Sequence, residues 1–147
     1  MNTSMKLTAS ALIVLGMILA GCAETMQKPS ASLYDRLGGK GAITAVVDDF
    51  VGNVAADKRI NGRFAHANIP HLKEKLVEQI CAGSGGPCSY TGLDMKTAHT
   101  GMKITEAEFG ALVEDLVKTL DKFKVPAQEK NELLGVLGPM QKDIVGV

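Results

Sequence analysis

The sequence contains no tryptophan, and aromatic residues make up only 4% of its 147 residues. Leucine, valine, isoleucine, alanine and methionine must therefore form most of any core, because hydrophobic residues still account for 46% of the chain. The formal net charge is zero at pH 7, so the sequence lacks the excess of basic residues that is typical of nucleic-acid binding. A chain of this length is expected to form one domain.

Several motifs of familiar chemistry are also absent. The chain has no Cys-x-x-Cys-His, which argues against covalent attachment of a c-type haem. It has no His-Glu-x-x-His and no cluster of cysteines and histidines, which argues against a structural zinc site. No glycine-rich loop joins a strand to a helix, so a phosphate-binding loop is not predicted.

The first residues are expected to form an export signal rather than part of the folded domain. Lys6 gives a short positive region, and residues 7–20 are an almost unbroken apolar run that is short for a transmembrane helix. The run ends in Leu19-Ala20-Gly21-Cys22, which resembles the lipobox of bacterial lipoproteins. That resemblance implies a signal peptide over 1–21, cleavage before Cys22 and a diacylglycerol on its sulfur. The alternative is an uncleaved anchor with an incidental cysteine.

The residue after this cysteine bears on the destination. Ala23, rather than an aspartate, is similar to the outer-membrane sorting pattern of Gram-negative lipoproteins. We therefore expect an exported protein that is anchored to a membrane through Cys22, on the periplasmic side of the outer membrane if the source is Gram-negative. Residues 22–31 are polar, carry Pro29 and indicate a tether, which leaves 32–147 as the folded domain.

Export also bears on the two other cysteines, Cys81 and Cys88. An oxidising compartment permits a disulfide between them. They flank the 83–87 segment, Gly-Ser-Gly-Gly-Pro, which can fold back and bring the two side chains together. A disulfide would add roughly 2–3 kcal/mol in the loop-entropy model. The residues leave two alternatives open, a disulfide and a pair of free thiols.

Apolar residues recur at intervals near 3.6 along the chain, and no stretch shows the sustained alternation of a strand. The predicted fold is therefore all-α. Thr105 and Glu108 form a capping box, Phe123 completes the apolar face of the helix that follows, and Pro139 should kink or break the last helix. The predicted helices lie at about 33–37, 41–56, 70–81, 94–99, 105–124 and from 126 onward.

His99 ends a short turn that Asp94 can cap and Gly101 can stop. Apolar helices are predicted on both sides of this turn. A lone histidine among apolar residues is more often a core or surface residue than a ligand. His99 by itself therefore predicts little.

Short segments spread along the chain match one protein family only in combination. The 94–99 segment, Asp-Met-Lys-Thr-Ala-His, is similar to a proximal-histidine motif. Further matches lie at 33–39, at 57–60 with Phe64, at 85–87 with Tyr90 and Gly92, at 105–109 and at 140–145. Together they resemble the group I truncated haemoglobins over about residues 32–145.

The resemblance implies a truncated globin, a two-over-two sandwich of helices around haem b that is held without a covalent bond. It makes His99 the proximal iron ligand, with the other ring nitrogen donating to a carbonyl or a similar acceptor. Phe64 matches the aromatic residue that packs against the porphyrin. Pocket walls, or else ordinary core, are expected at Met95, Met102, Ile104, Phe109 and Val113. The haem-binding positions that the resemblance implies are Phe50, Val51, Phe64, Leu72, Lys75, Leu76, Tyr90, Met95, His99 and Met102.

The distal side departs from the commonest family pattern. Val51 stands where many members have a tyrosine that donates a hydrogen bond to bound oxygen, and Leu72 and Leu76 stand where glutamine is frequent. An apolar lid cannot stabilise the partial negative charge on bound O2, and a lost bond to such an acceptor costs roughly 1.5–3 kcal/mol. We therefore expect O2 to leave faster than from a pocket with tyrosine and glutamine.

Polar residues near this side leave alternatives open. Lys75 can pair with a haem propionate, or it can ligate the iron as a neutral amine whose pKa burial and iron both lower. Gln79 stands at a position that is often aromatic in relatives, and it either opens the pocket or reaches the bound ligand. His66 and His71 lie near the distal entrance, where solvated surface residues are expected rather than ligands.

The resemblance implies a haem protein that reversibly binds O2 or another diatomic gas such as NO or CO, for binding or transport. The alternative is a haem enzyme that detoxifies nitric oxide, or performs other redox chemistry, with a separate electron donor. The apolar Val51, Leu72 and Leu76 argue against an efficient peroxidase, which needs an acid or base near the distal face. A third class, a haem-free structural lipoprotein, fits the helices but not the family motifs.

Overall fold

The computed structural model of the chain describes residues 31–147. The predicted signal peptide at 1–21, the lipidation site Cys22 and the tether up to residue 30 lie outside the described residues, and they stay predictions. Within residues 31–147, no helix is long and apolar enough to cross a membrane.

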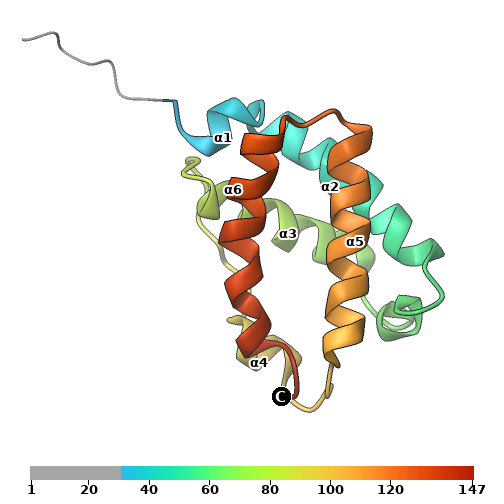
Figure 1. Cartoon of the computed structure of the whole chain (residues 1–147). Coiled ribbons are helices and arrows are strands. Elements are labelled where there is room, and N and C mark those ends of the chain that lie inside the picture. The colour runs from blue at the N-terminus through green and yellow to red at the C-terminus, as the bar shows by residue number, and fades with distance from the viewer. Residues whose placement is uncertain (1–30) are drawn as a thin grey trace, which may run out of the picture.

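The described part of the chain is helical, with short joints between the helices (Figure 1). It contains no strand, and its one isolated bridge pairs Ile104 with Val145. The all-α prediction is therefore confirmed. The elements are α1 (Leu33–Arg36), α2 (Gly39–Ala56), the 3-10 helix η1 (Asn61–Phe64), α3 (Ile69–Gly83), α4 (Met95–His99), α5 (Glu106–Lys122), α6 (Ala127–Leu137) and the 3-10 helix η2 (Gly138–Asp143).

Side-chain caps explain where α3 and α5 begin. At α3, the side chain of Asn68 accepts a hydrogen bond from the backbone N–H of His71 at 3.1 Å, and Pro70 lies in the first turn. At α5, Thr105 and Glu108 form the predicted capping box, in which each side chain accepts from the backbone N–H of the other residue. Caps of this kind typically contribute about 1 kcal/mol each.

The helix ends differ from the predictions by a few residues. α2 begins earlier than predicted, directly after Gly38, whose φ of 94° suits the turn from α1. The prediction that Phe123 completes the apolar face of α5 is wrong, because Phe123 lies beyond the last turn and is 41% exposed. The chain turns away there at Lys124, which has a φ of 55°. α6 ends before Pro139, as predicted.

α2 is the central element of the fold. It packs against both α3 and α5, and Figure 1 shows α5 and α6 in front of α2 and α3. This arrangement of one helix pair over another is the predicted two-over-two sandwich. The buried face of α2 consists of Ile43, Val46, Val47, Phe50, Val51 and Val54.

A disulfide joins Cys81 in α3 to Cys88 in the following loop, with their Cα atoms 5.7 Å apart. The structure thus contains the disulfide rather than the pair of free thiols. Gly86, between the two cysteines, packs so closely that a side chain there would clash with the ring of Tyr34. The loop that leads from α3 toward α4 is therefore fixed both covalently and by packing against α1.

The C-terminal residues hold the segment that follows α4. The backbone N–H of Lys103 donates to the carbonyl of Val147 at 2.9 Å, and the N–H of Gly146 donates to the carbonyl of Ile104 at 2.9 Å. The end of the chain consequently lies beside the short helix that ends in His99 (Figure 1).

Candidate functional site

α4 is a helix of 5 residues that ends at His99. Its start is capped by Asp94, whose carboxylate accepts from the backbone N–H of Thr97 at 2.9 Å and from the Thr97 hydroxyl at 2.6 Å. Gly101, with a φ of 82°, reverses the chain after the helix. The turn therefore has the cap and the stop that the sequence predicts.

The ring of His99 is oriented by the backbone of its own helix. Its Nδ1 atom lies 2.7 Å from the carbonyl oxygen of Met95. A carbonyl oxygen can only accept, so Nδ1 carries the proton and donates. In a neutral imidazole this leaves a lone pair on Nε2, which is the arrangement that metal-ligating histidines use.

His99 lies beside a cavity whose walls are mostly apolar. From the predicted haem-binding residues, Phe64 and Met102 also line this cavity. From the predicted walls, Ile104 and Phe109 line it. The remaining lining residues are Ile60, Arg63, Glu108, Leu112 and Ile144. The chemistry of this lining, apolar side chains and a single nitrogen ligand, suits contact with a flat, largely apolar group that carries its own metal ion, whereas the cavity itself, about 70 Å³, is smaller than the roughly 300–1,000 Å³ of a typical cofactor pocket.

Arg63 and Glu108 form an ion pair at this cavity. The Arg63 guanidinium donates to both oxygens of Glu108, at 2.7 and 3.0 Å, and also to the carbonyl of Met102 at 2.9 Å. Arg63 and the backbone N–H of Thr105 lower the pKa of Glu108 to about 2. The sequence had marked Glu108 only as part of a capping box and had given no signal for Arg63. The pair ties η1, the segment after His99 and the start of α5 together.

The predicted distal residues lie on α2 and α3, and they do not line the cavity beside His99. Phe50 and Val51 are each 7% exposed and belong to the core. Leu72 and Leu76 are half-buried, and Leu76 packs against the same core. Contact between these residues and a haem group stays a prediction.

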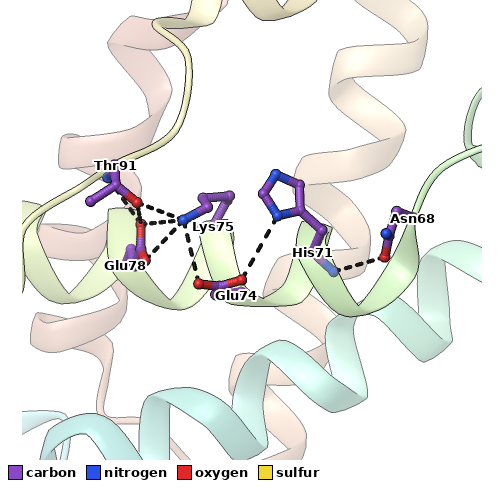
Figure 2. Close-up of polar contacts among 6 residues, drawn as sticks. All are labelled: Asn68, His71, Glu74, Lys75, Glu78 and Thr91. Carbon is purple, nitrogen blue, oxygen red and sulfur yellow. Dashed lines mark hydrogen bonds and ion pairs between the residues drawn. The ribbon is translucent and has the colours of Figure 1, made fainter.

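Lys75 forms an ion-paired network on the surface of α3 (Figure 2). Its Nζ donates to the carboxylate of Glu78 at 3.0 Å and to the hydroxyl of Thr91 at 2.6 Å, and it lies 3.5 Å from Glu74. The carboxylates, that of Glu78 first and then that of Glu74, raise the pKa of Lys75, although burial opposes its charge. Burial by itself lowers the pKa of this amine, but in this arrangement the neighbouring carboxylates outweigh desolvation, and ligation of the iron by a neutral Lys75 amine stays a prediction.

Glu78 also fastens the loop that leads to α4. Its carboxylate accepts from the backbone N–H of Thr91 at 2.9 Å and from the Thr91 hydroxyl at 2.8 Å. These bonds and that from Lys75 lower the pKa of Glu78 to about 2. In the same loop, the hydroxyl of Tyr90 donates to the carbonyl of Leu93 at 2.6 Å. The loop before His99 is thus held by hydrogen bonds as well as by the disulfide.

The two other histidines lie on the surface. His66 and His71 are both exposed. Nδ1 of His71 lies 3.8 Å from a carboxylate oxygen of Glu74, the next acidic residue on α3 (Figure 2). Across residues 31–147, no group of three or more His, Cys, Asp or Glu side chains is arranged to hold a metal ion.

Comparison with known proteins places this chain in a family. Residues 32–145 match the family model described as bacterial-like globin. The chain is 40% identical over 114 residues to the group 1 truncated haemoglobin GlbN of Mycolicibacterium paratuberculosis. The aligned residues cover 78% of this chain and 84% of that protein. The chain belongs to the group 1 truncated haemoglobins.

A second relative shows that the fold agrees as well as the sequence. The group 1 truncated haemoglobin of Tetrahymena pyriformis is 33% identical over 121 residues, covering 82% of this chain and 99% of that protein. The crystal structure of its Fe(III) form is similar to this truncated haemoglobin with a TM-score of 0.77 at 32% identity, over 80% of this chain and 100% of the other.

Membership of this family makes haem b, held without a covalent bond, the cofactor of this truncated haemoglobin. The residues beside His99 fit such a group. The lone pair on Nε2 of His99 is available to the iron, and Phe64, Met102 and Phe109 offer apolar surface to the macrocycle. When bound, the haem would supply an iron that can take up a small diatomic ligand.

Proposed function

We propose that this truncated haemoglobin reversibly binds O2 at an iron held by His99. The observation that carries the proposal is the bond from Nδ1 of His99 to the carbonyl of Met95, which in the neutral imidazole leaves the lone pair on Nε2, together with the apolar cavity that His99 lines. Val51 and Leu72 support gas binding rather than peroxide chemistry, because neither provides an acid or a base.

The first test measures haem uptake. Haemin is titrated into the mature protein prepared without haem, and into His99→Ala and His66→Ala. We expect the wild type to develop a Soret band, His99→Ala to bind haemin more weakly with a shifted band, and the exposed His66→Ala to behave like the wild type. A protein that takes up no haemin contradicts the proposal, and an unchanged His99→Ala spectrum contradicts the role of His99.

The second test measures reversibility. The reduced haem protein is cycled between O2 and argon while its absorbance is recorded. We expect the oxygenated and deoxygenated spectra to alternate over repeated cycles. Oxidation to the ferric form at each exposure would contradict reversible binding. Sustained consumption of nitric oxide by the oxygenated form, with a reductant present, would instead assign the alternative function of nitric-oxide detoxification.

We also propose that the mature protein begins at Cys22 and is attached to a membrane by a lipid on that residue. The Leu19-Ala20-Gly21-Cys22 sequence supports this, and the disulfide between Cys81 and Cys88 supports an oxidising compartment. Mass spectrometry of the wild type should find a diacylglycerol on residue 22, and Cys22→Ser should lack it. A wild-type protein without lipid, or cleaved elsewhere, contradicts this location.

A further inference from the structure

The side-chain amide of Gln79 connects α3 to α4 and η2. Its Nε2 atom lies 3.4 Å from the sulfur of Met95 in α4 and 3.5 Å from the sulfur of Met140 in η2. An amide nitrogen carries two hydrogens, so it can donate to both sulfurs, which are weak acceptors. Gln79 is the α3 residue directly after Glu78, which fastens Thr91 in the loop before α4.

α4 needs contacts of this kind to keep its position. It has 5 residues, and none of them is buried. A single helical turn does not form a stable helix by itself, because its nucleus is unfavourable. The cap provided by Asp94 fixes the turn internally but does not place it relative to the rest of the protein. Bonds from neighbouring elements must do so.

Met95 links the Gln79 amide to the ring of His99. The sulfur of Met95 accepts from Gln79, and the carbonyl oxygen of the same residue accepts from Nδ1 of His99 at 2.7 Å. A displacement of Met95 moves that carbonyl and changes the bond that sets the tautomer and the orientation of the ring. Gln79 and His99 are thus connected through one intermediate residue.

We propose that Gln79 is a positioning residue, which holds Met95 and thereby sets the orientation of the His99 ring. The sequence left open whether Gln79 opens the distal pocket or reaches the bound ligand, and both stay predictions; the structure adds that its amide lies within hydrogen-bonding distance of Met95 in α4 and Met140 in η2. The part of the proposal that concerns iron rests on the proposed function. The part that concerns α4 does not, and it can be tested without haem.

The haem-free test measures hydrogen exchange at α4 in the apoprotein. Gln79→Leu removes the amide at similar volume, and Gln128→Leu on α6 is a matched control that keeps Gln79. The backbone N–H groups of Ala98 and Met102 report on the turn. The first donates to the backbone carbonyl of Asp94 at 2.9 Å, and the second donates to the backbone carbonyl of His99 at 3.0 Å. We expect roughly two- to tenfold faster exchange in Gln79→Leu, the value of one hydrogen bond. Exchange equal to that of the control overturns the proposal.

The test with haem uses a signal that a general loss of stability does not move. In the reduced protein, resonance Raman spectroscopy detects the stretch between iron and the histidine nitrogen, whose frequency rises as Nδ1 donates more strongly. We expect Gln79→Leu to lower and broaden this band, and to speed haem loss roughly two- to tenfold. An unchanged band together with an unchanged rate overturns the proposal.

A variant of the intermediate residue completes the test. Met95→Leu removes the sulfur and keeps the backbone carbonyl, so it should reproduce the effect of Gln79→Leu. The double variant should then be no worse than Gln79→Leu, because Gln79→Leu has already removed the contact with Met95. If the effects of Gln79→Leu and Met95→Leu instead add in the double variant, Gln79 does not act through Met95. If the wild type binds no haem, the proposed function fails, whereas the exchange measurement still decides whether Gln79 holds α4.

Discussion

Nδ1 of His99 and the carbonyl oxygen of Met95 lie 2.7 Å apart, one turn from each other in α4. The contact is shorter than the usual N–H···O separation of about 2.9–3.0 Å. The ring is therefore oriented by a backbone group rather than by another side chain. Any replacement for the imidazole must recreate this bond to bind equally well.

That relationship predicts how free imidazoles will substitute for His99. In His99→Gly, we expect imidazole and 4-methylimidazole to restore haem binding, since each can ligate iron with one nitrogen and donate to Met95 with the other. 1-Methylimidazole has the same size as 4-methylimidazole but lacks the N–H. We expect it to bind roughly two- to tenfold more weakly, as one hydrogen bond is worth about 0.5–1.5 kcal/mol. Soret titrations measure the affinities, and equal values for the two methylimidazoles would count against the bond.

The network around Lys75 predicts how the ferric spectrum depends on this residue. Glu78 raises the pKa of the Lys75 ammonium, which has no lone pair to offer to iron while it is protonated. We therefore expect Lys75→Ala and the wild type to share one ferric spectrum near neutral pH. Any spectral change at alkaline pH that depends on Lys75 should move to lower pH in Glu78→Gln, because the carboxylate that favours the ammonium is gone. A Lys75-dependent ferric spectrum at neutral pH would show that the amine displaces its partners.

Much of the fold follows from patterns that are local in the sequence. The period of 3.6 in α2 and α5 reports a buried stripe, and the capping box of Thr105 and Glu108 marks the start of α5, because both depend on residues within a few positions of each other. Phe123 was misplaced for the complementary reason. A periodic pattern does not show where a helix stops, and here the turn at Lys124 stops it.

The site could be predicted only where a local motif carries it. His99 and its cap at Asp94 belong to one such motif. The Arg63–Glu108 pair joins residues 45 positions apart, and no local pattern announces it. The carboxylate partners of Lys75 were likewise not predictable, because the sequence shows that a residue lies on a partly apolar helix but not which carboxylates its side chain will reach.

The Arg63–Glu108 pair predicts an acid-sensitive contribution to stability. The pKa of Glu108 is about 2 in the folded protein, below its ordinary value of 4.5. Its stabilising effect is therefore complete above about pH 4.5 and is lost as the pH falls through about 2. We expect Glu108→Gln to lower the free energy of unfolding at neutral pH and to flatten its decline in acid. Urea unfolding of the apoprotein over a pH series measures this.

Glu106→Gln is the matched control for that experiment. It removes the same charge from the same first turn of α5 but leaves the Arg63 contact in place. We expect its acid dependence to follow that of the wild type. If both variants flatten the curve equally, the helix dipole rather than Arg63 accounts for the effect.

Asp115 predicts an opposite dependence on pH. It lies in α5 with 6% of its surface exposed, and within residues 31–147 its Oδ2 atom has no hydrogen-bond partner. Burial, with Asp57 nearby, raises its pKa above the ordinary 3.8, so its contribution to stability is present below that value and lost as the pH rises through the folded pKa. We expect Asp115→Asn to raise the free energy of unfolding at neutral pH by about 1 kcal/mol. In acid, where the carboxyl of the wild type is protonated, the difference between the variant and the wild type should be smaller. A loss of stability at neutral pH would mean that the carboxylate has a partner in solution.

Val51 provides the test of the distal side. It is 7% exposed on α2, and the family resemblance of the sequence implies that many members carry at this position a tyrosine that donates to bound oxygen. If this position faces the ligand, Val51→Tyr should slow O2 dissociation roughly ten- to a hundredfold, because a hydrogen bond to a charged acceptor is worth about 1.5–3 kcal/mol. Stopped-flow displacement of O2 by CO measures the rate.

The larger side chain also strains a buried site, so Val51→Phe, which adds the ring without the hydroxyl, is the necessary control. Slow release in Val51→Tyr but not in Val51→Phe assigns the effect to the hydroxyl, and equal rates in the two variants would place Val51 away from the bound gas.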